Sequence, residues 1–380
     1  MKTNLLRLSL LIFLLAVCLT SAEQDTPAEA ARAYQAGLQA LAEKKDHNAL
    51  AAFQRTVKID ASYAEAHYQL GVLYGKLSQW KPAIQALQTA IKLTPDFVDA
   101  YVRLGEAYLI ATANAKDAVE PLQHALQLQP DLSRARRLLG TAYLRQNQTD
   151  VAIHHLKQVQ QDSEARYLLG LAYFQAEDFT QAIPHFKAVI KRQSRHAKAH
   201  FNLGNCYLRT GKIIEGRAAL RAFEKLTREE EQLATLQRLI LDNPQRLQLR
   251  YQLAELHIKR TEWELAVIEL KACLTILPHD EKASELLGYT YLQTESYADA
   301  LEIYGNLVEA YPESAIYRNS LGIAYMMLKK PQPAITQFET AIRLNTTNPQ
   351  FYRNLANAYR EIGEVAKAKQ AYQRYRSLTK

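Results

Sequence analysis

The chain contains little glycine and proline, with 13 and 12 of these residues among 380. This scarcity disfavours an all-β protein or an enzyme built on glycine-rich loops, because tight turns depend on both residues. Apolar residues make up 48% of the chain and charged residues 23%, as in folded proteins and unlike disordered ones. The composition therefore predicts a folded chain that is dominated by helices.

Long apolar runs are also scarce, and the most prominent one lies near the start. Lys2 and Arg7 precede an apolar run of twelve residues at 8–19, and small residues follow at 20–22. Because a bilayer core needs about 20 apolar residues, this run is too short to span one. The pattern predicts a secretory signal peptide at 1–22 and an exported protein, either periplasmic in a bacterium or secreted.

Cysteine is rare, with three residues in the whole chain. Cys18 offers a rival processing site, that of a lipoprotein, although Val17 is larger than the small residue that precedes the cysteine at such sites. Cleavage after the predicted signal peptide leaves only Cys206 and Cys273, at helix positions that we expect to be buried. Two unpaired core thiols fit these positions better than a disulfide does.

Neither the charge nor the motifs favour a nucleic-acid partner or catalysis. The net charge of +8 is spread along the chain without a run of five or six like charges. Gly211-Lys212 is followed by isoleucine rather than the serine or threonine of a phosphate-binding loop. His196 and His200 share a helix face, as metal ligands do, but no third ligand is evident. We therefore expect no enzyme, no metal site and no cofactor.

The chain does contain a clear internal repeat of 34 residues. A small residue, which we call the marker, recurs ten times with spacings of 34, 34, 35, 30, 34, 50, 34, 34 and 34. A tyrosine stands three residues after eight of the ten markers, and a large apolar residue about sixteen residues after each. The markers are Gly37, Gly71, Gly105, Gly140, Gly170, Gly204, Ala254, Gly288, Gly322 and Ala356.

Each repeat has the pattern of two amphipathic helices, because its apolar residues recur at intervals of three and four. The small marker allows the two helices to approach closely, and the tyrosine fills the space between neighbours. Four prolines, at 95, 130, 278 and 312, end the second helix of their units. Since one repeat cannot bury its apolar face alone, the repeats must stack.

The residues at these spacings resemble the tetratricopeptide repeat (TPR), and the resemblance covers about residues 28–380. It implies an all-α, right-handed superhelical solenoid of about ten helix pairs with one concave face.

One interval departs from the repeat, since 50 residues separate Gly204 from Ala254. The surplus begins with Thr227 and a run of acidic residues, which is typical of a helix start, and ends at Pro244. We predict an extra, unpaired helix that bends the array or acts as a hinge. The predicted organisation is six repeats at 28–226, the extra helix at 228–241 and four repeats at 246–380.

The resemblance also implies where a ligand binds. In TPR arrays the first helix of each pair lines the concave groove, at three and two residues before the marker and at one, four and five after it. Here these and neighbouring positions carry aromatic and basic residues, which suit an extended peptide with acidic residues because arginine pairs with carboxylates. The alternative is that the aromatic residues pack neighbouring helices and the basic residues are solvated. The candidates are Tyr34, Tyr68, Lys76, Arg103, Arg134, Arg137, Arg145, Tyr167, Phe201, Asn205, Arg209, Tyr251 and Lys259.

The resemblance implies a non-catalytic scaffold that binds a peptide or partner protein in the groove, in envelope assembly or secretion. The alternative is a non-catalytic regulatory subunit of a glycan- or polysaccharide-handling enzyme complex, because TPR arrays are fused to glycosyltransferases in some families. Solenoids usually end in a polar capping helix, whereas the last helix here carries Tyr372 and Tyr375. We therefore also predict self-association through the C-terminal helix, and neither a nucleic-acid partner nor a membrane span.

Overall fold

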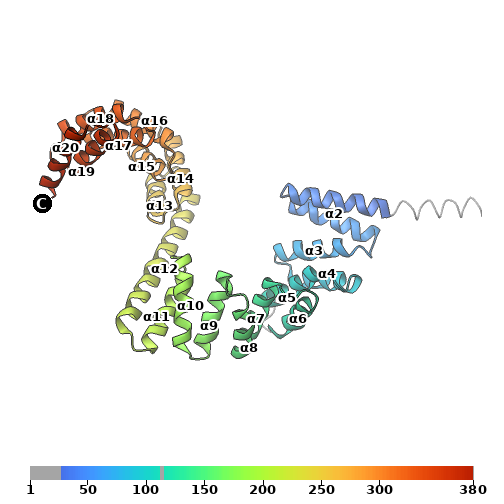
Figure 1. Cartoon of the computed structure of the whole chain (residues 1–380). Coiled ribbons are helices and arrows are strands. Elements are labelled where there is room, and N and C mark those ends of the chain that lie inside the picture. Colours follow the sequence, from blue (N-terminus) through green and yellow to red (C-terminus); the bar gives the residue numbers. More distant parts are fainter. Residues whose placement is uncertain (1–26, 112–114, 380) are drawn as a thin grey trace, which may run out of the picture. The chain divides into compact units, whose positions relative to one another are not determined.

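The computed structural model describes residues 27–111 and 115–379, and all regular elements in these residues are helices (Figure 1). This confirms the predicted all-α class. The predicted signal peptide at 1–22, with Cys18, lies outside the described residues. Among the described helices, none combines the length and the apolar character that a membrane span requires.

The chain divides into two compact units, one that ends at Glu224 and one that begins at Lys225. The first unit contains a helix at 27–42, α2 (Asp46–Ile59), α3 (Ala64–Lys76), α4 (Trp80–Leu93), α5 (Val98–Ala111), the short 3₁₀ helix η1 (Ala115–Ala118), α6 (Val119–Leu128), α7 (Ser133–Arg145), α8 (Thr149–Lys157), α9 (Ser163–Gln175), α10 (Phe179–Arg192), α11 (Ala197–Arg209) and the first part of α12 (Ile213–Asp242).

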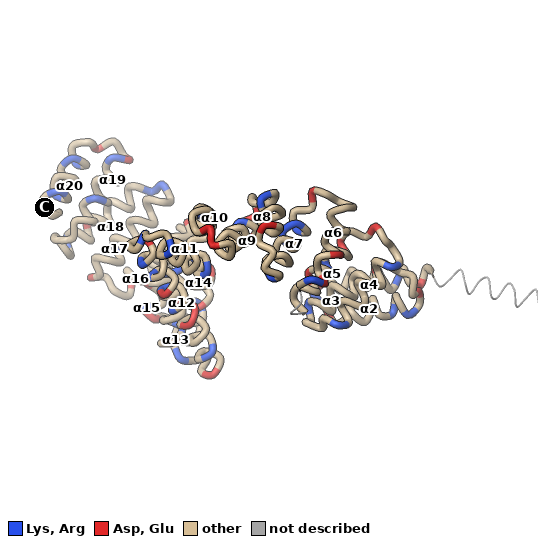
Figure 2. Tube along the Cα trace, turned by 90° about the horizontal axis from the view of Figure 1, so that it is seen from below, with Lys and Arg blue, Asp and Glu red and all other residues tan. Residues whose placement is uncertain are grey.

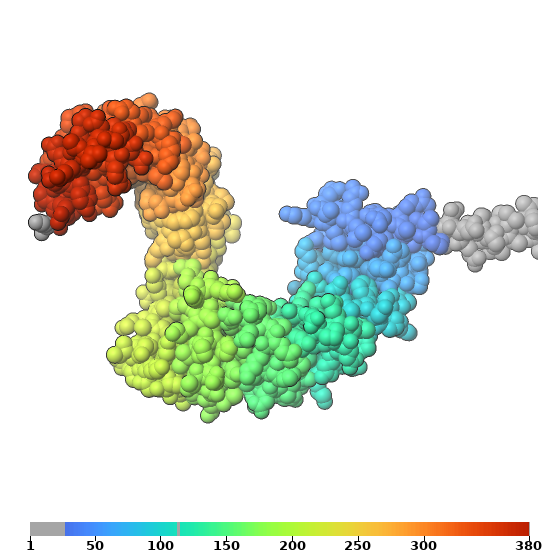
Figure 3. All heavy atoms as spheres, in the orientation of Figure 1, coloured from blue at the N-terminus to red at the C-terminus, as the bar shows by residue number. Residues whose placement is uncertain are grey.

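The second unit contains the rest of α12, α13 (Leu247–Lys259), α14 (Trp263–Ile276), α15 (Glu281–Gln293), α16 (Tyr297–Ala310), α17 (Ala315–Met327), α18 (Pro331–Leu344), α19 (Pro349–Glu361) and α20 (Val365–Leu378). From α2 to α11, and again from α13 to α20, each helix packs on the next one in the sequence. Within each unit the repeats therefore stack as a solenoid of helix pairs, and their atoms abut in the space-filling view (Figure 3).

The marker is small because a large side chain of the paired helix fills the space beside it. A Cβ atom added at Gly71 would lie 2.5 Å from Cγ of Leu87, and one added at Gly322 would lie 2.5 Å from Cε1 of Phe338. Both of these large side chains are almost fully buried, as the repeat pattern predicts. The close approach of the two helices is therefore what the marker supplies to each repeat.

The turn between the two helices of a pair uses a left-handed residue at a fixed place, seven residues after the marker. These residues have φ between 58° and 79°, and only two of the nine are glycine. They are Lys44, Ser78, Asn147, Glu177, Gly211, Thr261, Glu295, Lys329 and Gly363.

The tyrosine three residues after the marker joins its repeat to the preceding one. The hydroxyl of Tyr74 accepts a hydrogen bond from Gln54 at 2.9 Å, and Tyr108 accepts one from Gln88 at 3.0 Å. The same pairing recurs between Tyr143 and Gln123 at 3.0 Å. This contact between repeats explains part of the excess of tyrosine, which numbers 22 against 10 phenylalanines.

The two cysteines of the described residues are buried and unpaired, as their repeat positions predict. Burial raises the pKa of both thiols, Cys206 and Cys273, to about 11. They therefore stay protonated at neutral pH and behave as small apolar core residues.

The structure has one continuous helix where the sequence analysis expects a separate helix at 228–241. α12 runs for 30 residues, from the second helix of the sixth repeat through the acidic segment. No glycine or proline stands between Gly216 and Pro244, so nothing in the sequence ends the helix before Thr227. The division between the two units falls within α12.

Candidate functional site

A cavity of about 680 Å³ opens on the first helices of three successive repeats in the first unit, α5, α7 and α9. Its apolar lining consists of Leu109, Ile110, Leu138, Leu144, Leu168, Leu171 and Phe174. Its polar lining consists of Glu106, Arg137, Thr141, Arg145, Glu164 and Gln175. Most of these residues stand at the repeat positions that line the groove in the sequence analysis. We call this cavity the groove cavity.

The apolar lining is accessible to a ligand. Ile110 is 56% exposed, although it stands at the position that carries Lys76 and Arg145 in neighbouring repeats. Leu171 and Phe174 are half-buried and line the same cavity from α9. Exposed apolar side chains that meet in a concave surface are typical of a binding site.

A smaller cavity of about 260 Å³ is formed by α3, α4 and α5. Lys76 and Arg103 line it, and it shares Glu106 and Ile110 with the groove cavity. The structure therefore places four of the candidate basic residues along one surface, because Arg137 and Arg145 line the larger cavity.

Ion pairs within and between repeats occupy most of these basic residues. Oε2 of Glu106 accepts from Nη1 of Arg103 at 3.1 Å and from Nη2 of Arg134 at 2.5 Å. Nε of Arg137 lies 2.9 Å from Oδ2 of Asp162. The carboxylates compete with any acidic ligand for these guanidinium groups, so the positive charge of the groove is smaller than the sequence indicates.

Three basic residues that stand five positions after the marker bind the preceding repeat or helix. Nζ of Lys76 lies 2.6 Å from Oδ2 of Asp46, and Arg145 donates a hydrogen bond to the main-chain carbonyl of Leu109. In the second unit, Nζ of Lys259 lies 3.0 Å from a carboxylate oxygen of α12, that of Glu229. These contacts tie neighbouring helices together, and Lys76 and Arg145 also line the two cavities.

The aromatic candidates three positions before the marker pack against the start of the following repeat. Their ring partners stand eight residues before the next marker, with centroid separations of 4.9, 4.8 and 4.6 Å for Tyr34–Tyr63, Tyr68–Phe97 and Tyr167–His196. Tyr167 is only 8% exposed and Tyr251 only 7%. Burial raises the pKa of both phenols, and a ligand in the groove can touch little of either ring.

The last three candidates lie on α11, outside the lining of the two cavities. Phe201 is 43% exposed, and its ring centroid lies 5.1 Å from that of Phe223. Asn205 is half-buried and Arg209 is exposed. The structure thus brings part of the predicted set together at the groove cavity and leaves this group apart from it.

A repeated anchor four residues before the marker is a feature that the sequence did not predict. The side chain there bonds the carbonyl oxygen six residues earlier, as Nε2 of His200 does with Ser194 at 2.9 Å. Seven repeats share it, through His67, Arg136, Arg166, His200, Arg250, Arg318 and Tyr352. The signal in the sequence was the recurrence of long polar side chains at one position.

The two histidines considered as metal ligands have structural roles. His200 belongs to the anchor position, and Nδ1 of His196 accepts a hydrogen bond from the backbone N–H of Ala199 at 3.1 Å. Across residues 27–111 and 115–379, no three His, Cys, Asp or Glu side chains form a group that could hold a metal ion.

Models of the tetratricopeptide repeat match the chain in several segments. They cover residues 137–178, 167–231 and 286–349 with one model, 76–109 with a second and 338–370 with a third. These segments include most of α7 and all of α9, two of the helices that line the groove cavity. Among proteins with curated descriptions, none matches the chain.

Solved structures with a similar fold include YrrB, described as a TPR protein with an unusual peptide-binding site. It is 21% identical, with 46% of this chain and 92% of YrrB covered at a TM-score of 0.41. MamA from Desulfovibrio magneticus, from residue 41 to its end, is 22% identical, with 44% and 97% covered at 0.42. The TPR domain of P58(IPK) is 19% identical, with 88% and 98% covered at 0.28.

Proposed function

Because the chain carries tetratricopeptide repeats, we propose that it is a non-catalytic scaffold that binds a segment of a partner protein in the groove cavity of α5, α7 and α9. The observation that carries the proposal is the apolar part of the lining of this cavity, in which Ile110 is exposed and Leu171 and Phe174 are half-buried. Repeats of this kind form protein-protein interaction scaffolds, since their stacked helices present a continuous concave surface.

The chemistry of the lining suits an extended segment with apolar side chains. Such side chains would cover Ile110, Leu171 and Phe174. Removing water from these three side chains would supply most of the free energy of binding. An acidic residue of the same segment would approach Arg145, which donates a hydrogen bond to a main-chain carbonyl rather than pairing with a carboxylate. We therefore propose that apolar contacts supply most of the affinity and that the polar residues of the lining orient the segment.

The proposal is tested by selecting ligands from a random peptide library with the full chain and comparing variants. Ile110→Asp combined with Leu171→Asp places two charges on the apolar lining and should reduce the affinity of the selected peptides at least about tenfold. Val151→Asp is the matched control, because Val151 is an exposed apolar residue on α8, outside the cavity. Equal binding by the double variant and the wild type would refute the groove as the site.

We propose in addition that the scaffold is exported and acts in envelope assembly or secretion. The support is the sequence alone, in which Lys2 and Arg7 precede the apolar run at 8–19. Sequencing the N-terminus of the protein recovered outside the cytoplasm should give Glu23 as the first residue. Recovery of an intact N-terminus, or a lipid-modified Cys18, would overturn cleavage after residue 22.

Self-association through α20 remains part of the proposal. Tyr372 is 50% exposed, and Ala371 is the buried residue of this helix. A chain that ends at Gly363 lacks α20 and should show a lower oligomeric state than the full chain in light scattering. An unchanged oligomeric state would remove self-association from the proposal.

A further inference from the structure

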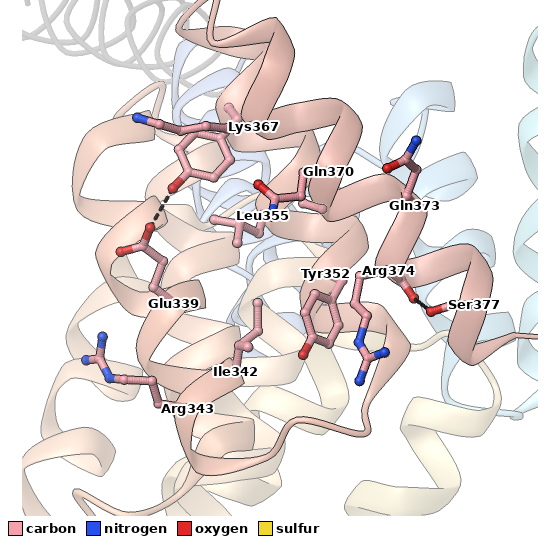
Figure 4. A pocket seen from close by; sticks show the side chains of 12 residues that line it. Glu339, Ile342, Arg343, Tyr352, Leu355, Lys367, Gln370, Gln373, Arg374 and Ser377 are labelled. Carbon is pink, nitrogen blue, oxygen red and sulfur yellow. Dashed lines mark hydrogen bonds between the residues drawn. The ribbon is translucent and has the colours of Figure 1, made fainter.

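A second large cavity lies in the last repeats, between α18, α19 and α20 (Figure 4). Its volume is about 720 Å³, and α18 and α20 both pack on α19, which forms its floor. The lining residues of α19 are Tyr352, Leu355 and Tyr359, whereas Arg353 and Asn357 occupy the groove positions of this helix. The cavity therefore belongs to the outer side of the solenoid, and we call it the outer cavity.

A small residue of the last helix, Ala371, borders this space, whereas the other three repeats of the second unit carry longer side chains at its position. Ala371 stands at the repeat position that carries Glu269 in α14, Ile303 in α16 and Gln337 in α18. In those repeats long side chains meet above the first helix, as Glu269 does when it accepts a hydrogen bond from Arg250 at 2.7 Å. Alanine cannot reach that far, so the space above Leu355 stays open.

The outer cavity combines an apolar floor with a basic edge. Leu355 of α19 lines the floor and Ile342 of α18 lines the adjoining wall. In the view of Figure 4, Ile342 and Tyr352 lie between Arg343 and Arg374. Nη2 of Arg343 donates to the hydroxyl of Thr340 at 2.7 Å. Within residues 27–111 and 115–379, neither arginine forms an ion pair.

The one carboxylate of the lining is already bonded. Oε1 of Glu339 accepts a hydrogen bond from the hydroxyl of Tyr359 at 2.5 Å. Burial and this bond raise the pKa of Tyr359 to about 12, so the phenol keeps its proton at neutral pH. Lys367, a third cation of the lining, lies 5.5 Å from the centre of the same ring, and its Nζ lies 3.5 Å from Oε2 of Glu364, so the two arginines carry the charge that is free of an ion pair. The charge that remains for a ligand is positive.

α20 as a whole has the same sign of charge. It carries Lys367, Lys369, Arg374 and Arg376 and no acidic residue (Figure 2). A cavity with an apolar floor and unpaired guanidinium groups complements a ligand with an apolar side chain between carboxylates.

We propose that the outer cavity is a second protein-binding site, which takes an acidic segment of a partner protein with a large apolar side chain between its acidic residues. The apolar side chain packs against Ile342 and Tyr352, which are half-buried and lie beside the buried Leu355, and the carboxylates pair with Arg343 and Arg374. A segment of protein fits better than an anionic membrane surface, because a concave site accepts an inserted side chain whereas a bilayer presents no protruding apolar group to it.

The test uses a fluorescent peptide of alternating acidic residues and leucines and the full-length protein. Its twin replaces every Asp and Glu by Asn and Gln, so that only the charge differs. We expect the acidic peptide to bind at least about tenfold more tightly than the twin, as measured by fluorescence anisotropy. Equal binding of the two peptides would overturn the proposal.

Two variants test the place of binding. Ala371→Ile fills the cavity with the residue that repeat eight carries at this position, so the fold should tolerate it, and binding should fall at least about tenfold. Arg343→Gln with Arg374→Gln should cause a similar loss. The matched control is Arg353→Gln with Arg360→Gln, because these arginines of α19 do not line the cavity. Unfolding curves check that each variant folds, and wild-type binding by Ala371→Ile would overturn the proposal.

Two further outcomes would assign the cavity to another occupant and so overturn the proposal. One is binding to phosphatidylserine vesicles, lost in Arg343→Gln with Arg374→Gln, without binding to the acidic peptide. The other is a dimer of the wild type that Ala371→Ile abolishes, which would place the contact in the cavity rather than at Tyr372, a residue of α20 that does not line it. The groove variant with Ile110→Asp and Leu171→Asp should leave binding of the acidic peptide unchanged, which separates this site from the proposed groove function.

Discussion

The groove cavity and the outer cavity both carry arginines, but these arginines differ in what they contact. In the groove cavity and beside it, Arg103 and Arg134 share Glu106, and Arg137 lies beside Asp162. In the outer cavity, Arg343 and Arg374 meet no carboxylate among the described residues. The lining of the groove cavity is instead rich in accessible apolar side chains.

This difference shows that the count of basic residues does not reveal the charge that a ligand meets. An arginine that pairs with a carboxylate of the next repeat stabilises the stack and presents little net charge. An arginine without such a partner gains more from an acidic ligand, because no internal ion pair has to be broken. We therefore expect apolar ligands at the groove cavity and acidic ligands at the outer cavity.

The largest effect should come from disrupting one unit and leaving the other intact. Gly140→Leu forces a side chain towards Leu156, because even a Cβ atom at Gly140 would lie 2.6 Å from its Cγ. We expect a loss of about 3 kcal/mol in the free energy of unfolding and loss of groove binding, while acidic peptides still bind the outer cavity. Chemical denaturation and the two binding assays measure this.

A control for that experiment lies in α16, at Gly305. A Cβ atom there has no neighbour within 4 Å, so Gly305→Ala should be neutral or stabilise the helix by up to about 1 kcal/mol. Loss of both binding activities in Gly140→Leu would show that the two cavities do not act separately.

Salt should weaken ligand binding at the two cavities to different degrees, an effect smaller than that of Gly140→Leu. Raising sodium chloride from about 50 mM to about 500 mM shortens the screening length and should weaken acidic-peptide binding at the outer cavity about tenfold. Peptides selected for the groove cavity should change by about twofold or less, because apolar contacts dominate there. Anisotropy titrations at both salt concentrations check this, and equal salt dependence would contradict the distinction.

Removing one carboxylate should make the groove resemble the outer cavity. Glu106→Gln leaves Arg103 and Arg134 without their shared partner, so acidic peptides should now bind the groove as well. The unfolding free energy should fall by about 1 kcal/mol, since these ion pairs are partly exposed. Glu164→Gln is the control, because Glu164 lines the same cavity outside this ion-pair cluster. If the Glu106→Gln variant does not bind acidic peptides in the groove, ion pairing with Glu106 is not what keeps acidic ligands from the groove.

The smallest effect concerns the turns of the two units. Thr261 has φ of 59°, whereas the same turn position in the sixth repeat, in the first unit, carries Gly211 with φ of 78°. A β-branched residue is disfavoured at positive φ, so Thr261→Gly should stabilise the second unit by about 0.5–1 kcal/mol. Gly211→Thr should do the reverse in the first unit. Thermal unfolding of both variants measures the signs, and a destabilised Thr261→Gly would contradict this account of the turn.

The repeat could be predicted from the sequence because its strongest constraints are local and recur. The marker, the tyrosine three residues later and the large side chain near sixteen depend only on the packing of neighbouring helices, so they appear ten times in register. The separate helix expected at 228–241 is part of α12. An acidic segment can lie inside a helix when no glycine or proline before it ends that helix.

The binding surface was harder to predict, because side-chain partners lie in neighbouring repeats. Position alone suggested that Tyr167 and Tyr251 face a ligand, yet both rings are buried against the next repeat. The repeat position did not indicate the role of Ile110, which stands where neighbouring repeats carry Lys76 and Arg145. Ile110 is the most exposed apolar residue of the groove cavity. Space created by a small residue, as at Ala371, depends on three helices at once.

The central claim, that the groove cavity holds a partner segment, is tested most directly by site-specific photocrosslinking in the cell. A photoreactive residue replaces Ile110 in one chain and Val151, on α8, in another. We predict adducts with one or a few partner proteins from position 110 and none of these from position 151. Adducts from position 151 alone, or the same adducts from both positions, would contradict binding in the groove.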